Sequence, residues 1–258
     1  MALYEVRGLA KAFGDNRVLE SIDFDLHQGE VLTIIGKSGS GKSVLIKMLI
    51  GLLQADAGTI VFDGENVTDR KEHEWAPVRR RVGMMFQEYA LFDSMNVFDN
   101  VAYGLREQRL LPEPEIAERV AESLASVSLP GIEQMSPKDL SGGMKKRVAL
   151  ARAIAVRPEV VLYDEPTEGL DPINVTRVDR LLLKLRDEQG ITTVIVTHNM
   201  RSTFRISDRI ALVHEGKIEL AGTPDEFRAY ASDPVIQPYL GASRVSLRPP
   251  PPMPPPPQ

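Results

Sequence analysis

The 258-residue chain contains no cysteine, which excludes disulfide bonds, thiolate metal sites and cysteine nucleophiles. It also lacks a run of about 18 consecutive apolar residues, the length that a membrane-spanning helix requires. Basic residues are not in excess: the net charge is -5, which argues against a general nucleic-acid binder. The N-terminal segment has no charged stretch followed by an apolar run, so no secretory signal is expected. These absences predict a cytoplasmic globular protein that does not cross a bilayer by itself.

Short β-branched runs alternate with helical patterns along most of the chain. The expected strands are 30–35, 59–62, 160–163, 191–197 and 209–214, and the expected helices are 43–53, 113–127, 145–156 and 173–188. This alternation indicates βαβ units and an α/β fold with a mostly parallel sheet. Strand signals fade between Tyr89 and Asp139, which favours a helical insert there.

The C-terminal end differs from the rest in composition. The last ten residues contain eight of the 19 prolines. Such a segment can form neither helix nor core, so it is expected to be polyproline-II or disordered.

Residues 36–43 read GKSGSGKS, which fits the phosphate-loop pattern between a strand and a helix. Glycines let the backbone amides point inward, and the helix N-terminus adds partial positive charge. Lys42 would reach the outer phosphates, and the Ser43 hydroxyl would ligate Mg²⁺. The predicted phosphate-binding residues are Gly36, Lys37, Ser38, Gly39, Ser40, Gly41, Lys42 and Ser43.

A second apolar strand ends in two acids, Asp164 and Glu165. Asp164 is expected to hold Mg²⁺ and Glu165 to polarise an attacking water, which favours hydrolysis over transfer to a substrate. His198 follows another apolar strand and is suited to contact a terminal phosphate at the neighbouring strand ends. The alternative interpretations are a buried strand that ends in surface acids and a structural histidine.

The run Leu140-Ser141-Gly142-Gly143-Met144 lies just before a predicted helix and completes this set of motifs. With it, the chain resembles the ATP-binding cassette family over about residues 3–230. The resemblance implies an ATPase with a RecA-like P-loop core, an N-terminal antiparallel β subdomain and a helical subdomain at about 89–145. The implied cassette spans 1–231, and a C-terminal extension spans 232–258, with the proline-rich tail from about 244.

The resemblance also implies roles for single residues. Gln87 would ligate Mg²⁺ or water and report the nucleotide state to a membrane partner. Ser141, Gly142 and Gly143 of one subunit would cap the terminal phosphate of ATP bound to a second subunit, so a homodimer is implied. Asp171 would form the loop after the acidic strand.

Phe13 stands where the family places an aromatic side chain that stacks on adenine, with core packing as the alternative. Lys37 replaces a more usual proline, and Glu168-Gly169-Leu170 replaces Ser-Ala-Leu. Neither departure removes a catalytic group.

Met144 and the run ALFDSMNVFDNVAYGLRE from Ala90 resemble the ATPase subunits of Mla/Mce-type lipid transporters. That resemblance implies a membrane-embedded permease of the Mla type, an MCE-domain lipid-binding protein and a STAS-domain small subunit. It places the chain on the cytoplasmic face of the inner membrane. Residues 233–241 resemble a C-terminal extension that reaches the other ATPase subunit in some members.

Two alternatives share the catalytic motifs. One is the ATPase subunit of an amino-acid or other small-solute importer. The other is a soluble cassette acting on ribosomes or DNA, which usually has two fused cassettes or a long coiled coil. An apolar group beside Gln87 would receive a helix of a partner or fill the core of the helical insert. Its members are Leu91, Phe92, Met95, Val97 and Phe98.

Overall fold

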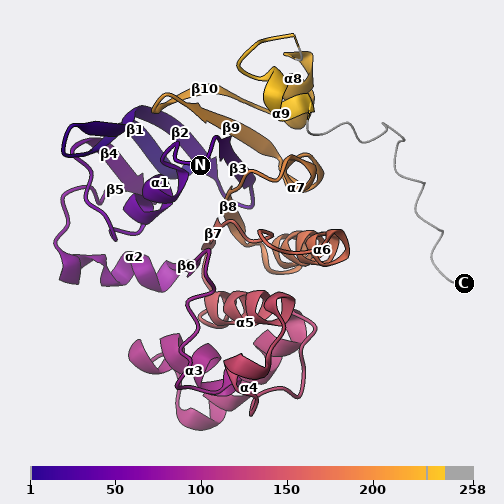
Figure 1. Cartoon of the computed structure of the whole chain (residues 1–258). Coiled ribbons are helices and arrows are strands. Elements are labelled where there is room, and N and C mark those ends of the chain that lie inside the picture. Colours follow the sequence, from indigo (N-terminus) through magenta and orange to yellow (C-terminus); the bar gives the residue numbers. More distant parts are fainter. Residues whose placement is uncertain (1, 231, 242–258) are drawn as a thin grey trace, which may run out of the picture.

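The computed structural model describes residues 2–230 and 232–241 and shows one large sheet with a helical group attached to it (Figure 1). The predicted polyproline tail lies outside the described residues. The strands are β1 Ala2–Phe13, β2 Asn16–His27, β3 Val31–Gly36, β4 Ala57–Phe62, β5 Glu65–Asn66, β6 Val82–Met85, β7 Val160–Asp164, β8 Thr192–Val196, β9 Arg209–His214 and β10 Lys217–Gly222.

The 10-stranded sheet has two parts of different character. The strand order is β5-β4-β1-β2-β10-β9-β3-β8-β7-β6. The strands from β9 to β6 run parallel, whereas β1, β2, β4 and β5 pair in antiparallel fashion. β10 joins the two parts, because it is antiparallel to β9 and pairs with β2. The expected parallel sheet is therefore present in one part only, beside the antiparallel subdomain that the resemblance implied.

Burial explains which strands were visible in the sequence. Every residue of β3, β7 and β8 is buried, as is usual for parallel strands covered on both faces, and such strands read as continuous apolar runs. β1 and β2 were not placed individually, because charged residues interrupt their apolar positions. β1 also contains register shifts, for example between Val6 and Leu9, which break a simple alternation.

The helical elements cover the sheet or pack beside it. They are α1 Lys42–Leu49, η1 Glu72–Trp75, α2 Ala76–Arg81, α3 Val97–Glu107, α4 Glu113–Ser126, η2 Pro137–Asp139, α5 Gly142–Ala155, α6 Pro172–Gln189, α7 Met200–Ile206, α8 Pro224–Ala229 and α9 Gln237–Gly241. None of the described helices has the length and apolar character needed to cross a bilayer.

Two helix boundaries differ from the expected ones for physical reasons. α1 ends four residues early, because Gly51 follows with a φ of 65° and the ring of Trp75 packs where a side chain would stand. α5 begins at Gly142, three residues earlier than expected, because the Ser141 hydroxyl accepts a hydrogen bond from the Met144 amide and caps the helix.

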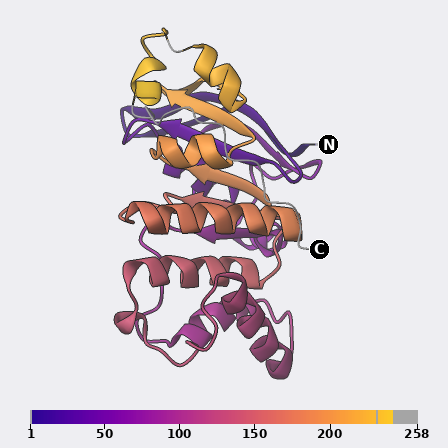
Figure 2. The same cartoon turned by 90° about the vertical axis from the view of Figure 1, so that its right-hand side faces the viewer.

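Helices α3, α4 and α5 pack together at the bottom of Figures 1 and 2, at the end of the molecule away from the antiparallel strands. Their interface is a hydrophobic cluster that includes the fully buried Val101, Leu105, Val120 and Leu124. The core of the helical group is thus continuous with buried side chains of α6 and of the parallel strands, such as Tyr163 and Ile195.

The chain returns to the sheet at its C-terminal end. α8 and α9 lie next to each other near β9 and β10 (Figure 1). Ile236 is buried in a small cluster with Ile35, Met200 and Phe227. Residues 232–241 therefore pack against their own subunit here, and a contact with a second subunit stays a prediction.

Candidate nucleotide site

The carboxyl ends of β3, β7 and β8 meet at one edge of the parallel sheet and line a pocket of about 660 Å³. Ligands of open α/β sheets bind at this edge. The lining residues are Val18, Gly36, Lys37, Ser38, Gly39, Gly41, Lys42, Ser43, Val44, Gln87, Glu165, Glu168, His198 and Tyr239. Residues of three motifs far apart in the sequence, namely the phosphate loop, Glu165 of the acid pair and His198, thus share one cavity, whereas Asp164 is buried beside it and is not among the lining residues.

The phosphate loop needs glycine at two positions for different reasons. A side chain at Gly36 would come within 2.6 Å of the Val213 carbonyl oxygen. Gly41 has a φ of 90°, and a side chain there would lie 2.7 Å from the Leu19 side chain. Because glycine has no side chain to make these clashes, the loop can turn tightly into α1, whose N-terminus faces the pocket.

Lys42 folds back over the loop. Its Nζ donates hydrogen bonds to the carbonyl oxygens of Gly36 at 2.9 Å and Lys37 at 3.0 Å. Burial lowers the pKa of the Lys42 ammonium, and the carboxylates of Glu165 and Asp164 oppose this shift. The ammonium is held inside the loop, in the position from which a P-loop lysine reaches phosphate oxygens.

Ser43 and Asp164 form a direct pair, because the Ser43 hydroxyl donates to Asp164 Oδ1 at 2.8 Å. Burial raises the pKa of the Asp164 carboxyl, and the bond from Ser43 partly offsets this shift. One hydroxyl and one carboxylate beside a phosphate cradle are the ligands that Mg²⁺ takes in nucleotide sites, where phosphate oxygens and waters complete its coordination. The two residues therefore fit the predicted Mg²⁺ site.

Glu165 has a left-handed backbone, with a φ of 49°, directly after β7. Strained backbone of this kind persists where the surroundings hold it in place. Glu165 Oε2 accepts a hydrogen bond from the Thr197 hydroxyl at 2.8 Å, and Oε1 lies 2.9 Å from His198 Nδ1. Glu165 is 8% exposed. Its carboxylate is held in the pocket by Thr197 and His198, which directly follow β8.

Two further contacts connect the edge of the pocket to the rest of the fold. Gln87 Nε2 donates to Glu168 Oε2 at 2.7 Å, which ties the segment after β6 to the segment after β7. The buried Lys146 of α5 donates to the carbonyl oxygens of Glu165 and Glu168. The sequence analysis did not single out Lys146, whose position two residues after Met144 gives no signal of burial.

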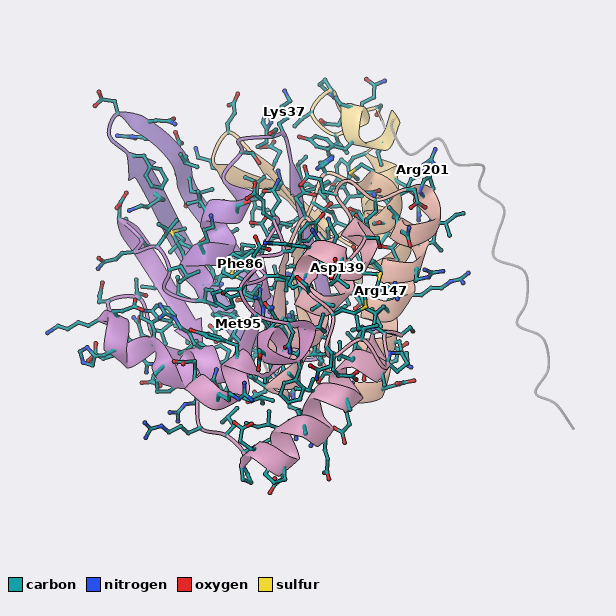
Figure 3. The ribbon with its side chains drawn as sticks, turned by 60° about the horizontal axis from the view of Figure 1, so that its bottom comes forward. Lys37, Phe86, Met95, Asp139, Arg147 and Arg201 are labelled. Atoms are coloured by element: carbon teal, nitrogen blue, oxygen red, sulfur yellow. The ribbon has the colours of Figure 1, made fainter. Side chains whose placement is uncertain are left out.

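Ser141, Gly142 and Gly143 do not line this pocket within the described part of the chain. Ser141 and Gly142 are exposed at the start of α5. In the view of Figure 3, Lys37 of the phosphate loop lies near the top edge of the molecule, whereas Asp139 lies near the middle. The signature residues are therefore not part of the phosphate pocket of their own subunit.

Asp171 and Phe13 also lie outside the lining of the pocket. Asp171 caps α6 by accepting hydrogen bonds from the amides of Ile173 and Asn174, and the bond from Asn174 lowers the pKa of its carboxyl. Phe13 is 49% exposed, which excludes the core-packing alternative, and the Lys11 ammonium lies 5.6 Å from its ring centre. Its face is available to a ligand.

Most of the predicted residues thus meet at one cavity, together with side chains that the sequence did not mark. The additional lining residues are Val18, Val44, Glu168 and Tyr239. Of these, Glu168 was noticed only as a departure from the usual family residue. Tyr239 belongs to the C-terminal segment, more than 190 residues after the loop that it approaches, so no local pattern pointed to it.

Comparison with known proteins identifies the family. The family model described as ABC transporter matches residues 19–168. The chain is 43% identical over 240 residues to the sulfate/thiosulfate import ATP-binding protein CysA of Xylella fastidiosa, covering 92% of this chain and 68% of that protein. It is 38% identical over 241 residues to the probable ribonucleotide transport ATP-binding protein mkl of Mycobacterium leprae, covering 93% of this chain and 69% of that protein.

A solved structure matches as well. It is a dimeric ATP-binding cassette in a post-hydrolysis state bound to ADP and Pi, with 29% identity and a TM-score of 0.79. The match covers 86% of this chain and 98% of that one. The matched cassettes dimerise and belong to transporters, and the chain spans about two thirds of the length of its curated relatives. The chain therefore belongs to the ATP-binding cassette family, as an ATP-hydrolysing subunit of an ABC transporter that works with Mg²⁺.

Proposed function

We propose that this subunit energises an Mla/Mce-type lipid transporter. The proposal rests on Met144 and on the segment 90–107, which resembles the corresponding segment of lipid-transport ATPases. In the structure this segment carries an exposed aromatic pair. Phe92 is 40% exposed and Tyr103 is 38% exposed, and their ring centres lie 4.8 Å apart.

The loop that carries Phe92 is rigidly held. Asn100 is fully buried, and its side chain accepts a hydrogen bond from the Phe92 amide at 2.8 Å and donates to the carbonyls of Phe92, Met95 and Asn96. Val97 is buried and packs into the helical core, whereas the Phe92 ring points outward. A preorganised aromatic surface of this kind suits a helix of a membrane permease.

In the proposed cycle, ATP binding closes a homodimer and hydrolysis opens it. Glu165 polarises the attacking water, with His198 and Thr197 holding its carboxylate. Ser43, Asp164 and Gln87 are the residues that would hold Mg²⁺. Ser141, Gly142 and Gly143 of the second subunit cap the terminal phosphate, with their helix N-terminus adding partial positive charge. Asp171 orders the start of α6, and Phe13 stacks on adenine.

The contact between Gln87 and Glu168 suggests how the cycle reaches the membrane. Gln87 lies five residues before Phe92 in the chain and lines the same pocket as Glu165. Binding of Mg²⁺ or water by the Gln87 amide oxygen would reorient the side chain whose Nε2 now donates to Glu168, and would shift the loop between Gln87 and Phe92. The aromatic pair would transmit this shift to the permease at the inner face of the membrane.

The experiment that tests the lipid assignment is isolation of the native complex. A tagged Glu165→Gln variant is extracted from its own membranes in mild detergent with ATP, and co-purifying proteins are identified by mass spectrometry. The expected partners are a permease and an MCE-domain lipid-binding protein, with or without a STAS-domain subunit. The matched control carries Phe92→Ala and Tyr103→Ala in addition, and should lose the permease.

Small-solute import is the second candidate, and the similarity to the sulfate/thiosulfate import protein favours it. Recovery of a solute-binding protein with a different permease would support this candidate and reject the lipid assignment. Recovery of ribosomal proteins, or of no membrane protein, would reject both.

A further inference from the structure

Tyr239 enters the nucleotide pocket from a part of the chain outside the catalytic motifs. It lies on α9, in the segment 232–241 that packs back onto the sheet. Ile236, three residues earlier, is 3% exposed and is anchored in the cluster that contains Ile35, the residue just before the phosphate loop. This anchor holds Tyr239 beside the beginning of that loop.

The hydroxyl of Tyr239 is buried, and its hydrogen-bonding capacity is not fully used. Among the described residues it has no hydrogen-bond partner of normal geometry. Burial raises the pKa of Tyr239, and the backbone amide of Lys37 partly offsets this shift by facing the phenol oxygen. An oxygen that faces an amide donor keeps its own hydrogen available for an acceptor. A buried hydroxyl left without an acceptor is costly, so a ligand that supplies one is favoured.

The neighbours of Tyr239 indicate which part of the nucleotide it would meet. Lys37 follows β3 at the start of the phosphate loop, and its carbonyl accepts a hydrogen bond at 3.0 Å from Lys42 Nζ, the ammonium of the kind that reaches outer phosphates and that also feels the charge of Glu165. Val44, by contrast, lies inside α1 at the other end of the loop. A carboxylate that polarises water for attack on the terminal phosphate must lie near that phosphate. Tyr239 therefore shares the terminal-phosphate end of the pocket.

We propose that the Tyr239 hydroxyl donates a hydrogen bond to the terminal phosphate of ATP, so that the C-terminal segment distinguishes ATP from ADP. The C-terminal segment would thereby add a contact to the terminal phosphate from the same subunit that carries the phosphate loop. This assignment concerns ATP binding alone and is independent of the cargo of the transporter.

The test is equilibrium binding of ATP and of ADP to the full chain in EDTA, which prevents hydrolysis. Tyr239→Phe removes only the hydroxyl and should weaken ATP binding about tenfold, the loss typical of one hydrogen bond to a charged group. ADP affinity should change less than about twofold, because ADP lacks the acceptor. The control is Tyr230→Phe, at an exposed tyrosine after α8, which should change neither affinity.

A second variant protects the test against a local packing artefact. Ile236→Ala loosens the anchor and should produce the same selective loss of ATP binding, with the melting temperature of the whole cassette measured in parallel. Equal losses for ATP and ADP, or unchanged binding of both, would overturn the proposal. Tighter ATP binding by either variant would also overturn it, because Tyr239 would then obstruct the pocket.

Discussion

The phosphate-loop side and the signature side of this cassette are built in opposite ways. At the ends of β3, β7 and β8, polar groups are buried and bonded to one another: Lys42 and Glu165 are each 8% exposed. At the start of α5, Ser141 and Gly142 are exposed, and the Ser141 hydroxyl serves to cap its own helix. One chain therefore contains a preorganised phosphate site and, elsewhere on its surface, the group that would close such a site.

This difference has a physical reason. Buried polar groups need partners in the folded chain, so the phosphate-loop side can be assembled only where several strands end together. An exposed helix N-terminus has water as its partner and can exchange it for an anion on association. The contrast is what a cassette needs if its site is completed by a second copy.

The largest expected effect is the loss of ATP hydrolysis when the phosphate-loop side is altered. Glu165→Gln keeps the shape of the side chain but removes its charge and its basicity, so ATP hydrolysis should fall about 100-fold or more. ATP binding should persist, because the phosphate loop is unchanged. Steady-state phosphate release and a separate binding titration measure the two quantities. Rapid hydrolysis by this variant would show that Glu165 is not the base.

The next largest effect is expected when the signature side, at the start of α5, is altered. Ser141→Ala should remove one hydrogen-bond donor to the terminal phosphate bound by the other subunit and lower hydrolysis about 100-fold, as loss of an oxyanion-binding group does, while each subunit still binds ATP. Lys42→Ala should also be inactive, because it removes the lysine of the phosphate loop and leaves the signature residues intact. Mixing the two inactive variants should restore activity, because one intact site forms in each heterodimer. Failure of the mixture, with dimers present, would contradict a site shared between subunits.

A third prediction separates the helical group from the sheet. Leu105 is fully buried in the core of α3, α4 and α5, so Leu105→Ala should lower the free energy of unfolding by about 2–5 kcal/mol. Chemical denaturation measures this change. ATP binding to the monomer should be nearly unaffected, because no residue of that core lines the pocket in the described chain. A matching loss of nucleotide binding would mean that the stability of the helical group and the shape of the nucleotide pocket depend on each other.

Lys146 joins the two sides, because it lies on α5 and donates to the carbonyls after β7. Lys146→Met leaves these carbonyls without their donor, at a cost of about 1–3 kcal/mol in the free energy of unfolding. The expected signature is a lower melting temperature together with slower hydrolysis. Lys145→Met, at the less buried neighbour, is the control and should change both only slightly.

The smallest effect concerns Phe13. Its exposed ring contributes little to the core, so Phe13→Ala should leave the melting temperature unchanged and weaken ATP binding about threefold to tenfold, the range expected for one stacking contact. Phe13→Tyr should retain full affinity. Unchanged binding by Phe13→Ala would remove Phe13 from the adenine site.

Local sequence was sufficient wherever the chemistry is contiguous. The loop 36–43 needs its glycines, lysine and serine at fixed spacing, and β7 must end in acids, so both could be recognised without a fold. The fully buried strands were visible for the same reason. The antiparallel strands β1 and β2 were not placed, because their apolar positions are interrupted by charges and register shifts.

The amino-acid sequence by itself determined the class of chemistry, because phosphate binding and hydrolysis depend on residue types at short spacings. Only the tertiary structure decided how Glu165 is held by Thr197 and His198, that Lys146 bridges α5 to the acid strand, and that Tyr239 reaches the phosphate loop. It also decided that Ser141 lies outside the pocket formed by its own phosphate loop. These relations join segments tens to hundreds of residues apart, and they depend on the order of strands and on the packing of buried side chains.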